Sequence, residues 1–299
     1  MASNKQEWIH ALKHLRLHFS LLLMPVFLFA ISQIKEINII DAITLFLILH
    51  LLIYPASNIF NSFYDRDEGS VGGLKNPPPS NIKMLWLANL LDIIAITASA
   101  LLINFNEILP ILVYIIVSRL YSYRPIRLKK YPYIGFLTIF LFQGALTYYM
   151  TTRLSSQYNT IGCLPAFWKS PQEASLFAML ATSFQIGAIY PLTQIYQHES
   201  DLADGVTTLS YKLGYRGTFI FAGIMFGIAT LFYYLHFKQT YINSFYLFTA
   251  VQVPIIGYFV YWASKVWKDT NYADYKHTMY MNVIAAVVLN LFFLYLVLT

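Results

Sequence analysis

Charge and cysteine are both scarce in this sequence. Charged residues make up only 11% of its 299 residues, where a soluble domain carries about 25%. The single cysteine, Cys163, excludes an internal disulfide. Apolar residues take the place of charge, because 58% of the chain is hydrophobic and 17% is aromatic. Since apolar runs recur along the whole length, the composition excludes an ordinary soluble globule and indicates a polytopic membrane protein.

Nine runs are long enough, or nearly so, to cross a membrane. Their hydrophobicity is nearly continuous rather than alternating, which predicts helices and not the strands of a barrel. The fourth run is short for a span of about 20 residues. We therefore expect an all-α bundle of about nine transmembrane helices that forms a single domain over residues 1–299. The predicted spans are 15–33, 39–58, 84–103, 108–121, 134–152, 174–195, 217–235, 244–263 and 279–298.

Lys and Arg are distributed unequally between the two predicted sides of the membrane. Sixteen of the 20 lie in the N-terminus or in the loops after the second, fourth, sixth and eighth spans. The other side holds Lys35, Arg153, Lys169 and Lys238. Because cytoplasmic loops carry the excess of basic residues, we expect a cytoplasmic N-terminus and a C-terminus outside. The net charge of +6 reflects this bias, so the expected partner is a lipid bilayer and no nucleic acid.

Acidic residues are rarer still, and six of the 14 lie in two short segments. These six are Asp65, Asp67, Glu68, Glu199, Asp201 and Asp204. Each segment follows an apolar run, and both fall on the predicted cytoplasmic side. A charge run is usually a solvated face, but the scarcity of acids elsewhere favours a functional site here. Magnesium is commonly held by one or two carboxylates together with waters and the phosphate oxygens of a substrate.

Three further patterns accompany the acids. Asn61 and Asp65 are four residues apart, so they would share a helix face. Residues 119–130 carry five cations, more than orientation requires, and Arg and Lys are suited to binding phosphate. The segments 58–83 and 196–216 resemble each other in following an apolar run with acids and glycines, which suggests a pseudo-repeat.

These motifs resemble those of the UbiA superfamily of intramembrane prenyltransferases over nearly the whole chain. Members of that superfamily carry Asn-x-x-x-Asp-x-x-x-Asp after the second helix and Asp-x-x-x-Asp after the sixth. Here the first motif has Asn61 and Asp65, and the second has Asp201, with Gly205 after it. The second motif is followed, as in the family, by Thr208-Leu209 and Leu213-Gly214. The loop after the fourth span also matches the family pattern, at Tyr121, Ser122, Pro125, Leu128 and Lys129.

The chain departs from the family pattern at two positions. The third position of the first motif is Gly69, so Asp67 or Glu68 would have to substitute for the missing acid. The first position of the second motif is Gln197, with Glu199 and Asp204 as stand-ins.

The resemblance implies a Mg²⁺-dependent enzyme with a central cavity capped by cytoplasmic loops. It would transfer an isoprenyl group from an allylic isoprenyl diphosphate to a lipophilic, aromatic acceptor. The implied catalytic residues are Asn61, Asp65 and Asp201. The implied diphosphate-binding residues are Arg16, Arg66, Lys75, Tyr121, Arg127 and Lys129. The implied metal ligands are Asn61, Asp65, Asp67, Glu68, Gln197, Asp201 and Asp204.

Several alternatives remain open from the sequence. A membrane phosphotransferase of the CDP-alcohol type also uses acidic clusters, and a cation-coupled transporter would use paired acids. Asp92, in the middle of a predicted span, either lines a cavity or forms a hydrogen bond between helices. Quinone precursors, chlorophyll-like or haem rings, and lipid alcohols are all possible acceptors.

Overall fold

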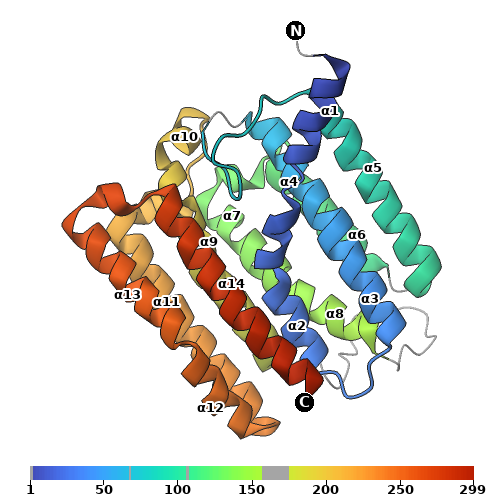
Figure 1. Ribbon diagram of the computed structural model, residues 1–299, viewed down its shortest axis with the longest axis vertical. Coiled ribbons are helices and arrows are strands. Elements are labelled where there is room, and N and C mark those ends of the chain that lie inside the picture. Colours follow the sequence, from blue (N-terminus) through green and yellow to red (C-terminus); the bar gives the residue numbers. More distant parts are fainter. Residues whose placement is uncertain (1–2, 67–68, 106–107, 157–174) are drawn as a thin grey trace.

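The computed structural model describes residues 3–66, 69–105, 108–156 and 175–299. Within these residues every regular element is a helix, apart from two isolated β-bridges. The helices form a bundle, and the N- and C-termini lie at opposite ends of it (Figure 1). The predicted all-α class is therefore confirmed. The helices are α1 (Asn4–Lys13), α2 (Met24–Ser32), α3 (Ile39–Leu47), α4 (Tyr54–Asp65), α5 (Ile82–Ala98), α6 (Leu109–Ser122), α7 (Pro132–Ile139), α8 (Thr147–Ser155), α9 (Leu176–Gln194), α10 (His198–Ala203), α11 (Leu209–Gln239), α12 (Ile242–Val251), α13 (Val253–Lys268) and α14 (Tyr275–Leu298).

Seven helical stretches in the described part of the chain are long and apolar enough to cross a membrane. A bent pair, Asn4–Leu22 and Met24–Ser32, whose two halves differ in direction by 43°, is together long and apolar enough as well, and it raises the number to eight if the pair is one span. The short apolar helix α6 corresponds to the fourth predicted span, so the total agrees with the expected count of about nine. The seven stretches are Ile39–Asp65, Ile82–Ile103, Pro132–Ser155, Leu176–Ala203, Leu209–Gln239, Ile242–Lys268 and Tyr275–Leu298.

The outward faces of these helices are apolar. Ile40, Trp86 and Leu101 are 74%, 68% and 78% exposed, and many other large apolar side chains share this orientation. A soluble monomer would not expose so much contiguous apolar surface. The chain is therefore an integral, multi-pass membrane protein whose outer surface is suited to hydrocarbon.

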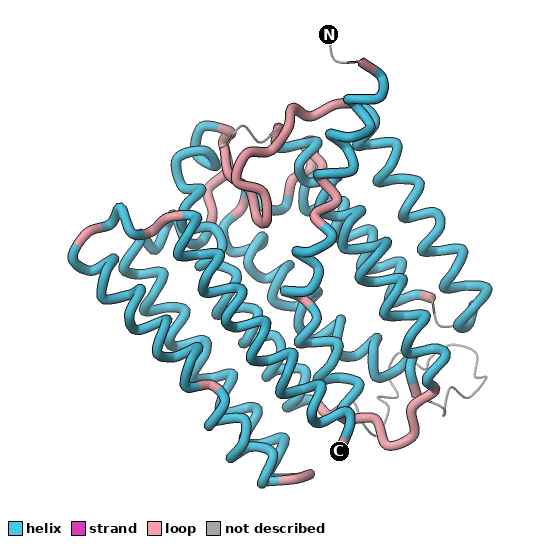
Figure 2. Tube along the Cα trace, in the orientation of Figure 1, coloured by secondary structure: helices cyan, strands magenta, loops and turns pink. Residues whose placement is uncertain are grey.

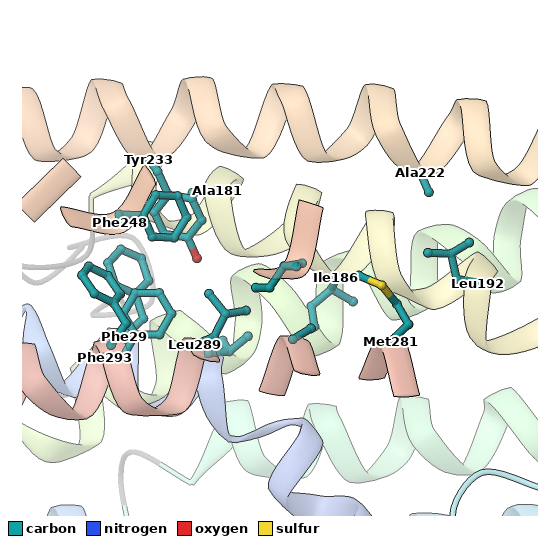
Figure 3. Close-up of a cluster of buried hydrophobic side chains, with 14 of the residues drawn as sticks. Phe29, Ala181, Ile186, Leu192, Ala222, Tyr233, Phe248, Met281, Leu289 and Phe293 are labelled. Atoms are coloured by element: carbon teal, nitrogen blue, oxygen red, sulfur yellow. The ribbon is translucent and has the colours of Figure 1, made fainter. Parts of the chain in front are cut away.

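The largest buried cluster lies between α2, α9, α11 and α14 (Figure 3). Phe29 of α2 lies at its centre, with its ring centroid 5.0 Å from that of Tyr233 and 4.9 Å from that of Phe293. Phe248 of α12 packs against Tyr233 with centroids 4.4 Å apart. Tilted and edge-to-face ring pairs of this kind favour one fixed arrangement, so the cluster holds the helices that surround the site.

Irregular turns divide several of the long helices near the site. A π-helical segment, Ile48–Ile53, joins α3 to α4, so the second predicted span continues to Asp65. The stretch α11 is broken at Gly214, whose φ of 68° and ψ of 174° are not helical. A short turn from Leu209, capped by the Thr208 side chain, which accepts a hydrogen bond from the Tyr211 backbone N–H, therefore precedes the long helix that corresponds to the seventh predicted span. The long loop between α4 and α5 crosses the end of the bundle at which α1 and α10 lie (Figure 2).

Candidate functional site

A cavity of about 720 Å³ lies between α2, α4, α6, α9 and α14. Residues of the two acidic segments line it at the end of the bundle that carries α10. Apolar side chains line it elsewhere, among them Val26, Ile186 and Leu289. This division into a charged part and an apolar part suits a ligand with a polar head and a hydrocarbon tail.

The helix α4 brings the first motif to the cavity. It continues through Asp65, so Asn61 and Asp65 share the predicted face and both line the cavity. It ends because Arg66 adopts a left-handed backbone conformation with φ 53°. The Asn61 Oδ1 atom accepts hydrogen bonds from Ser122 Oγ at 2.7 Å and from Lys129 Nζ at 3.2 Å. The amide is thereby oriented by the last residue of α6 and by the segment that links α6 to α7.

Asp65 lies between two cations of that same segment. Its Oδ1 atom accepts a hydrogen bond from Arg127 Nη2 at 3.0 Å, and its Oδ2 atom forms an ion pair with Lys129. The Asp65, Arg127 and Lys129 side chains are only 12%, 8% and 10% exposed. Because water screens such interactions little at low exposure, the three groups are held in fixed relative positions.

Arg127 connects the two acidic segments. It forms an ion pair with Asp204, and its Nη1 atom donates a hydrogen bond to the Asp204 carbonyl oxygen at 3.0 Å. Arg124 reaches the same carboxylate at 2.9 Å. Burial lowers the pKa of the Arg127 guanidinium, but hydrogen bonds and charges from Asp204 and Asp65 raise it, and the net direction is upward. Arg127 is therefore a permanent cation beside Asp65 and Asp204, although it is not itself among the described residues that line the cavity.

A break after α9 brings the second acidic segment to the cavity. Pro191 lies inside α9, where it removes one helical hydrogen bond, and a 3₁₀ turn, Ile195–Gln197, separates α9 from α10. Asp201 and Asp204 then line the cavity, and Gly205, with φ 69°, follows the end of α10. The reversal of the chain at Gly205 requires a left-handed conformation, which glycine adopts without steric cost.

Gln197, the residue at the departure from the second motif, also lines the cavity. Its Nε2 atom donates a hydrogen bond to the Ser70 carbonyl oxygen at 3.3 Å. The two predicted motif segments are thus in direct contact, although they lie 127 positions apart in the chain.

Two tyrosines form a hydrogen-bonded pair beside the acids. The hydroxyls of Tyr121 on α6 and Tyr190 on α9 are bonded to each other, and both residues line the cavity. Gln194 Nε2 donates a hydrogen bond to the Tyr190 hydroxyl at 2.8 Å. Asp65 and Asp201 both lie close enough to act electrostatically on the Tyr121 hydroxyl. The first motif, the second motif and Tyr121 therefore surround one part of the cavity.

Arg16 lies where the first bent span meets the loop after α4. It is 5% exposed and lines the cavity. Its Nη1 atom donates a hydrogen bond to the Gly72 carbonyl oxygen at 3.1 Å, and its Nη2 atom donates one to the Asn58 carbonyl oxygen at 2.9 Å. These bonds connect the N-terminal segment to the first motif.

The remaining predicted site residues differ in whether they line the cavity. Arg66 is exposed and lines the cavity. Lys75 is exposed and is not among the lining residues that the structure describes. Asp67 and Glu68 lie outside the described residues.

The donor set is suited to a hard divalent cation such as Mg²⁺. Asn61, Asp65, Asp201 and Asp204 all present oxygen atoms around the cavity. No three Asp, Glu, His or Cys side chains converge in the described part of the chain. A Mg²⁺ ion that takes most of its ligands from water and phosphate needs only one or two carboxylates, so the residues fit that mode of binding.

Asp92 and Arg119 are not part of the cavity lining among the described residues. Asp92 on α5 is 8% exposed, and its Oδ2 atom accepts a hydrogen bond from Arg119 Nε at 2.7 Å. Of the two roles that the sequence leaves open for Asp92, the structure supports an interaction between helices. Arg119, which the sequence assigns to a loop, lies within α6.

Sequence reasoning did not single out several polar residues of the cavity. They are Arg124, Gln143, Gln185, Tyr190, Gln194 and Asn282. Apart from Arg124 in the basic loop, each lies inside an apolar run. A polar residue within a predicted span is the signal that could have identified them.

The chain resembles known proteins both in its sequence and in its fold. The sequence profile described as the UbiA prenyltransferase family matches residues 22–296. Among curated proteins no significant match is found. The fold is similar to that of a UbiA homolog from Archaeoglobus fulgidus bound to GPP and Mg²⁺, with a TM-score of 0.68, 15% identity, and coverage of 97% of this chain and 100% of that one.

Two other solved structures share the fold. A UbiA homolog from Aeropyrum pernix K1 in its apo state has a TM-score of 0.67 at 13% identity, covering 93% of this chain and 97% of that chain. A digeranylgeranylglyceryl phosphate synthase has a TM-score of 0.60 at 17% identity, covering 98% of this chain and 100% of that chain.

Proposed function

We propose, from the premise that this chain belongs to the UbiA prenyltransferase family, that it transfers an isoprenyl group from an allylic isoprenyl diphosphate to a lipophilic acceptor with an aromatic ring. Diphosphate is released, and the reaction depends on Mg²⁺. Family membership disfavours both the CDP-alcohol-type phosphotransferase and the cation-coupled transporter. Both acidic segments and the basic segment would face the cytoplasm.

The observation that carries the proposal is the position of Asp65 between Arg127 and Lys129 at the charged part of an apolar cavity. An ion-pair network that served only to stabilise the fold would not need an apolar cavity beside it. A diphosphate with a hydrocarbon tail requires both features, because its head carries several negative charges and its tail avoids water. The tail would lie along the apolar part of the cavity.

The residues divide into two roles. Asn61, Asp65 and Asp201 would hold Mg²⁺, with Gln197 and Asp204 beside them. Arg16, Arg66, Tyr121, Arg127 and Lys129 would bind the diphosphate oxygens, whereas exposed Lys75 would act only at the rim. A bound Mg²⁺ neutralises charge on the diphosphate and polarises its oxygens.

The chemistry is a substitution at the allylic carbon. The bond between that carbon and the diphosphate oxygen breaks, and its electron pair leaves with the diphosphate. A ring carbon of the acceptor forms the new C–C bond and then loses a proton. Lys129 lines the cavity beside Asp65, and Arg127 lies against Asp65 and Asp204, so both cations would stabilise the negative charge that grows on the leaving group without reorganisation.

The similar solved structures support the donor and the metal. One Archaeoglobus fulgidus UbiA homolog is bound to GPP and Mg²⁺, and another structure of a homolog from that organism is bound to DMAPP and Mg²⁺. We extend both ligand classes to this chain on the basis of its acids and cations.

The test uses the purified full-length protein in detergent with geranyl diphosphate and a panel of aromatic acceptors. We expect diphosphate release that requires both Mg²⁺ and an acceptor. Asp65→Ala and Asp201→Ala should each lower the rate by about 100-fold or more, because each removes a group at the reacting diphosphate. Asp269→Ala, in the exposed segment before α14, is the matched control and should retain full activity. Turnover without Mg²⁺, or full activity in either cavity variant, would contradict the proposal.

A further inference from the structure

Gln194, Tyr190 and Tyr121 form a continuous series of hydrogen bonds in the cavity wall, which we call the tyrosine network. Gln194 and Tyr190 are four residues apart on α9, so they share one face of that helix. The Gln194 Nε2 atom donates a hydrogen bond to the Tyr190 hydroxyl at 2.8 Å, and that hydroxyl is bonded to the hydroxyl of Tyr121 on α6. All three side chains line the cavity. The network therefore joins α9 to α6 at the cavity surface.

The α9 end of the network is held in place by its surroundings. Gln194 is the last residue of α9 and is only 9% exposed. The Thr193 hydroxyl donates a hydrogen bond to the Tyr190 carbonyl oxygen at 2.7 Å, which adds a side-chain bond to the backbone of this last turn. The network thus starts from a buried amide on a fixed turn, rather than from a group that water can reorient.

The α6 end of the network lies beside both acidic motifs. Ser122, the residue after Tyr121, donates a hydrogen bond to Asn61 Oδ1 at 2.7 Å. Asp65 and Asp201 both act electrostatically on the Tyr121 hydroxyl. The Tyr121 hydroxyl is therefore close to the position proposed for Mg²⁺ and the diphosphate.

The network has a preferred direction, which follows from the number of hydrogens available. Each hydroxyl has one hydrogen to donate and two lone pairs to accept with. The Tyr190 oxygen already accepts from Gln194, and the remaining partner of Tyr190 among the described residues is the Tyr121 oxygen. In the opposite direction the Tyr190 oxygen would accept two hydrogen bonds and the Tyr121 oxygen none. A head-to-tail arrangement is favoured because each bond polarises the next. It leaves the Tyr121 hydrogen for a ligand in the cavity.

We propose that Tyr190 and Gln194 are positioning residues that direct the O–H group of Tyr121 at an oxygen of the bound diphosphate. This inference rests on the proposed prenyl transfer. Without the network the Tyr121 hydroxyl hydrogen is free to rotate away from the ligand. With the network, the hydroxyl is oriented before the donor binds, and no reorganisation is needed as negative charge grows on the leaving diphosphate.

The experiment measures the affinity of the full-length protein in detergent for geranyl diphosphate, by calorimetry with Mg²⁺ and without an acceptor. Tyr121→Phe should weaken binding about 10-fold or more, because it removes a hydrogen bond to a charged group. Tyr190→Phe, which keeps the Tyr121 hydroxyl but not its orientation, should weaken binding about 3- to 10-fold. Gln194→Met, which is close in shape, should weaken it about 2- to 3-fold.

A double-mutant cycle separates positioning from an independent contact. Since Tyr190 acts through Tyr121, adding Tyr190→Phe to Tyr121→Phe should cause no further loss of affinity. A residue that only supported the fold would lower affinity to the same extent in both backgrounds. Melting temperatures verify folding, and Gln194→Met provides an independent result should Tyr190→Phe not fold.

Tyr233→Phe is the matched control for the loss of a buried hydroxyl. The Tyr233 hydroxyl donates a hydrogen bond to Gln185 Oε1 at 2.5 Å, but Tyr233 is not among the described lining residues and has no bond to the tyrosine network. Its replacement should lower the melting temperature and leave the affinity for geranyl diphosphate unchanged.

The two proposals fail in different ways. A wild-type protein that does not bind geranyl diphosphate with Mg²⁺ overturns prenyl transfer itself. If the wild-type protein binds it, unchanged affinity in Tyr121→Phe or in Tyr190→Phe overturns only the positioning role. Additive losses in the double variant overturn it as well. A larger loss in Tyr190→Phe than in Tyr121→Phe also does so, because the network would then run in the opposite direction.

Discussion

Three arginines near the site have backbone conformations that favour glycine. Arg16, Arg66 and Arg127 have φ values of 49°, 53° and 47°. A left-handed conformation costs a residue with a side chain roughly 1–2 kcal/mol. Each of the three lies at the start or end of a helical segment, where the chain turns beside the cavity. Contacts of the guanidinium groups offset this strain for Arg16 and Arg127, which places strained backbone next to the proposed diphosphate site.

The Asp92–Arg119 ion pair lies outside the described cavity lining and joins helices instead. Arg119 also donates a hydrogen bond to the Ala88 carbonyl oxygen at 2.9 Å and lies 4.0 Å from the ring centroid of Phe60. It thereby connects α4, α5 and α6 within the bundle. Burying both charges requires removing them from water, so the pair fixes geometry more than it adds stability.

A double-mutant cycle at this pair tests that view. Asp92→Leu alone should destabilise the protein by about 3–5 kcal/mol, because it leaves a buried guanidinium without its counterion. Adding Arg119→Met should restore most of the loss, since neither charge then remains. Unfolding in detergent at increasing denaturant measures all four proteins. If the double variant lost as much stability as the two single variants combined, the pair would not act as a coupled unit.

At the scale of elements, Gly144 permits the closest helix approach near the cavity. It lies in a π-helical segment, Phe140–Leu146, which packs against α9. A methyl group added at Gly144 would lie 2.4 Å from the Cα atom of Ser183, far inside van der Waals contact. The Ser183 hydroxyl also accepts a hydrogen bond from the Ala145 backbone N–H at 2.9 Å. Glycine is therefore required here to let two backbones meet.

Gly144→Ala should consequently force the π-helical segment and α9 apart. We expect a loss of about 1–3 kcal/mol in unfolding free energy, the usual cost of overpacking. Gly257→Ala is the matched control, because no atom lies within 4 Å of the added methyl group and helix propensity favours alanine. It should be neutral or stabilising in the same thermal melt. If Gly144→Ala and Gly257→Ala had the same effect on stability, the two backbones would be able to move apart at Gly144 without a loss of stability.

The sequence predicts the helices better than it predicts their breaks. Continuous apolar runs place the nine spans well, since burial in hydrocarbon requires about 20 apolar residues. The 43° bend after Leu22 and the π-helical turns within spans are absent from that reasoning, because they depend on packing against neighbours. The short turn that precedes the break at Gly214 in α11 depends on one cap, Thr208, which a hydropathy run does not register.

For the site, local motifs predict which residues gather, but not how they pair. Asn61, Asp65 and Asp201 do line one cavity, as their spacing and shared side of the membrane suggest. The bridge that Arg127 forms between Asp65 and Asp204 joins residues distant in sequence, and only the fold brings them together. Asn282 lies in a run whose strongest signal is hydrophobic, so its place in the cavity follows from the rotation of α14.

At the scale of the whole molecule, charge and shape indicate one orientation. The N-terminus and the charged part of the cavity lie at one end, and the C-terminus lies at the other (Figure 1). Sixteen of the 20 Lys and Arg residues belong to segments assigned to the first end. The positive-inside rule then predicts that this end faces the cytoplasm, which would let a water-soluble diphosphate head enter from the aqueous side.

Cysteine labelling tests this orientation directly, because Cys163 is the only cysteine to remove. In a Cys163→Ser background, Lys130→Cys marks the exposed segment before α7, and Tyr241→Cys marks the exposed turn between α11 and α12 at the opposite end. A membrane-impermeant maleimide should label Tyr241→Cys in intact cells and Lys130→Cys only in inverted vesicles. The cysteine-free protein is the control for background. Labelling with the reverse pattern would place the charged part of the cavity outside, and with it the entry of the diphosphate donor.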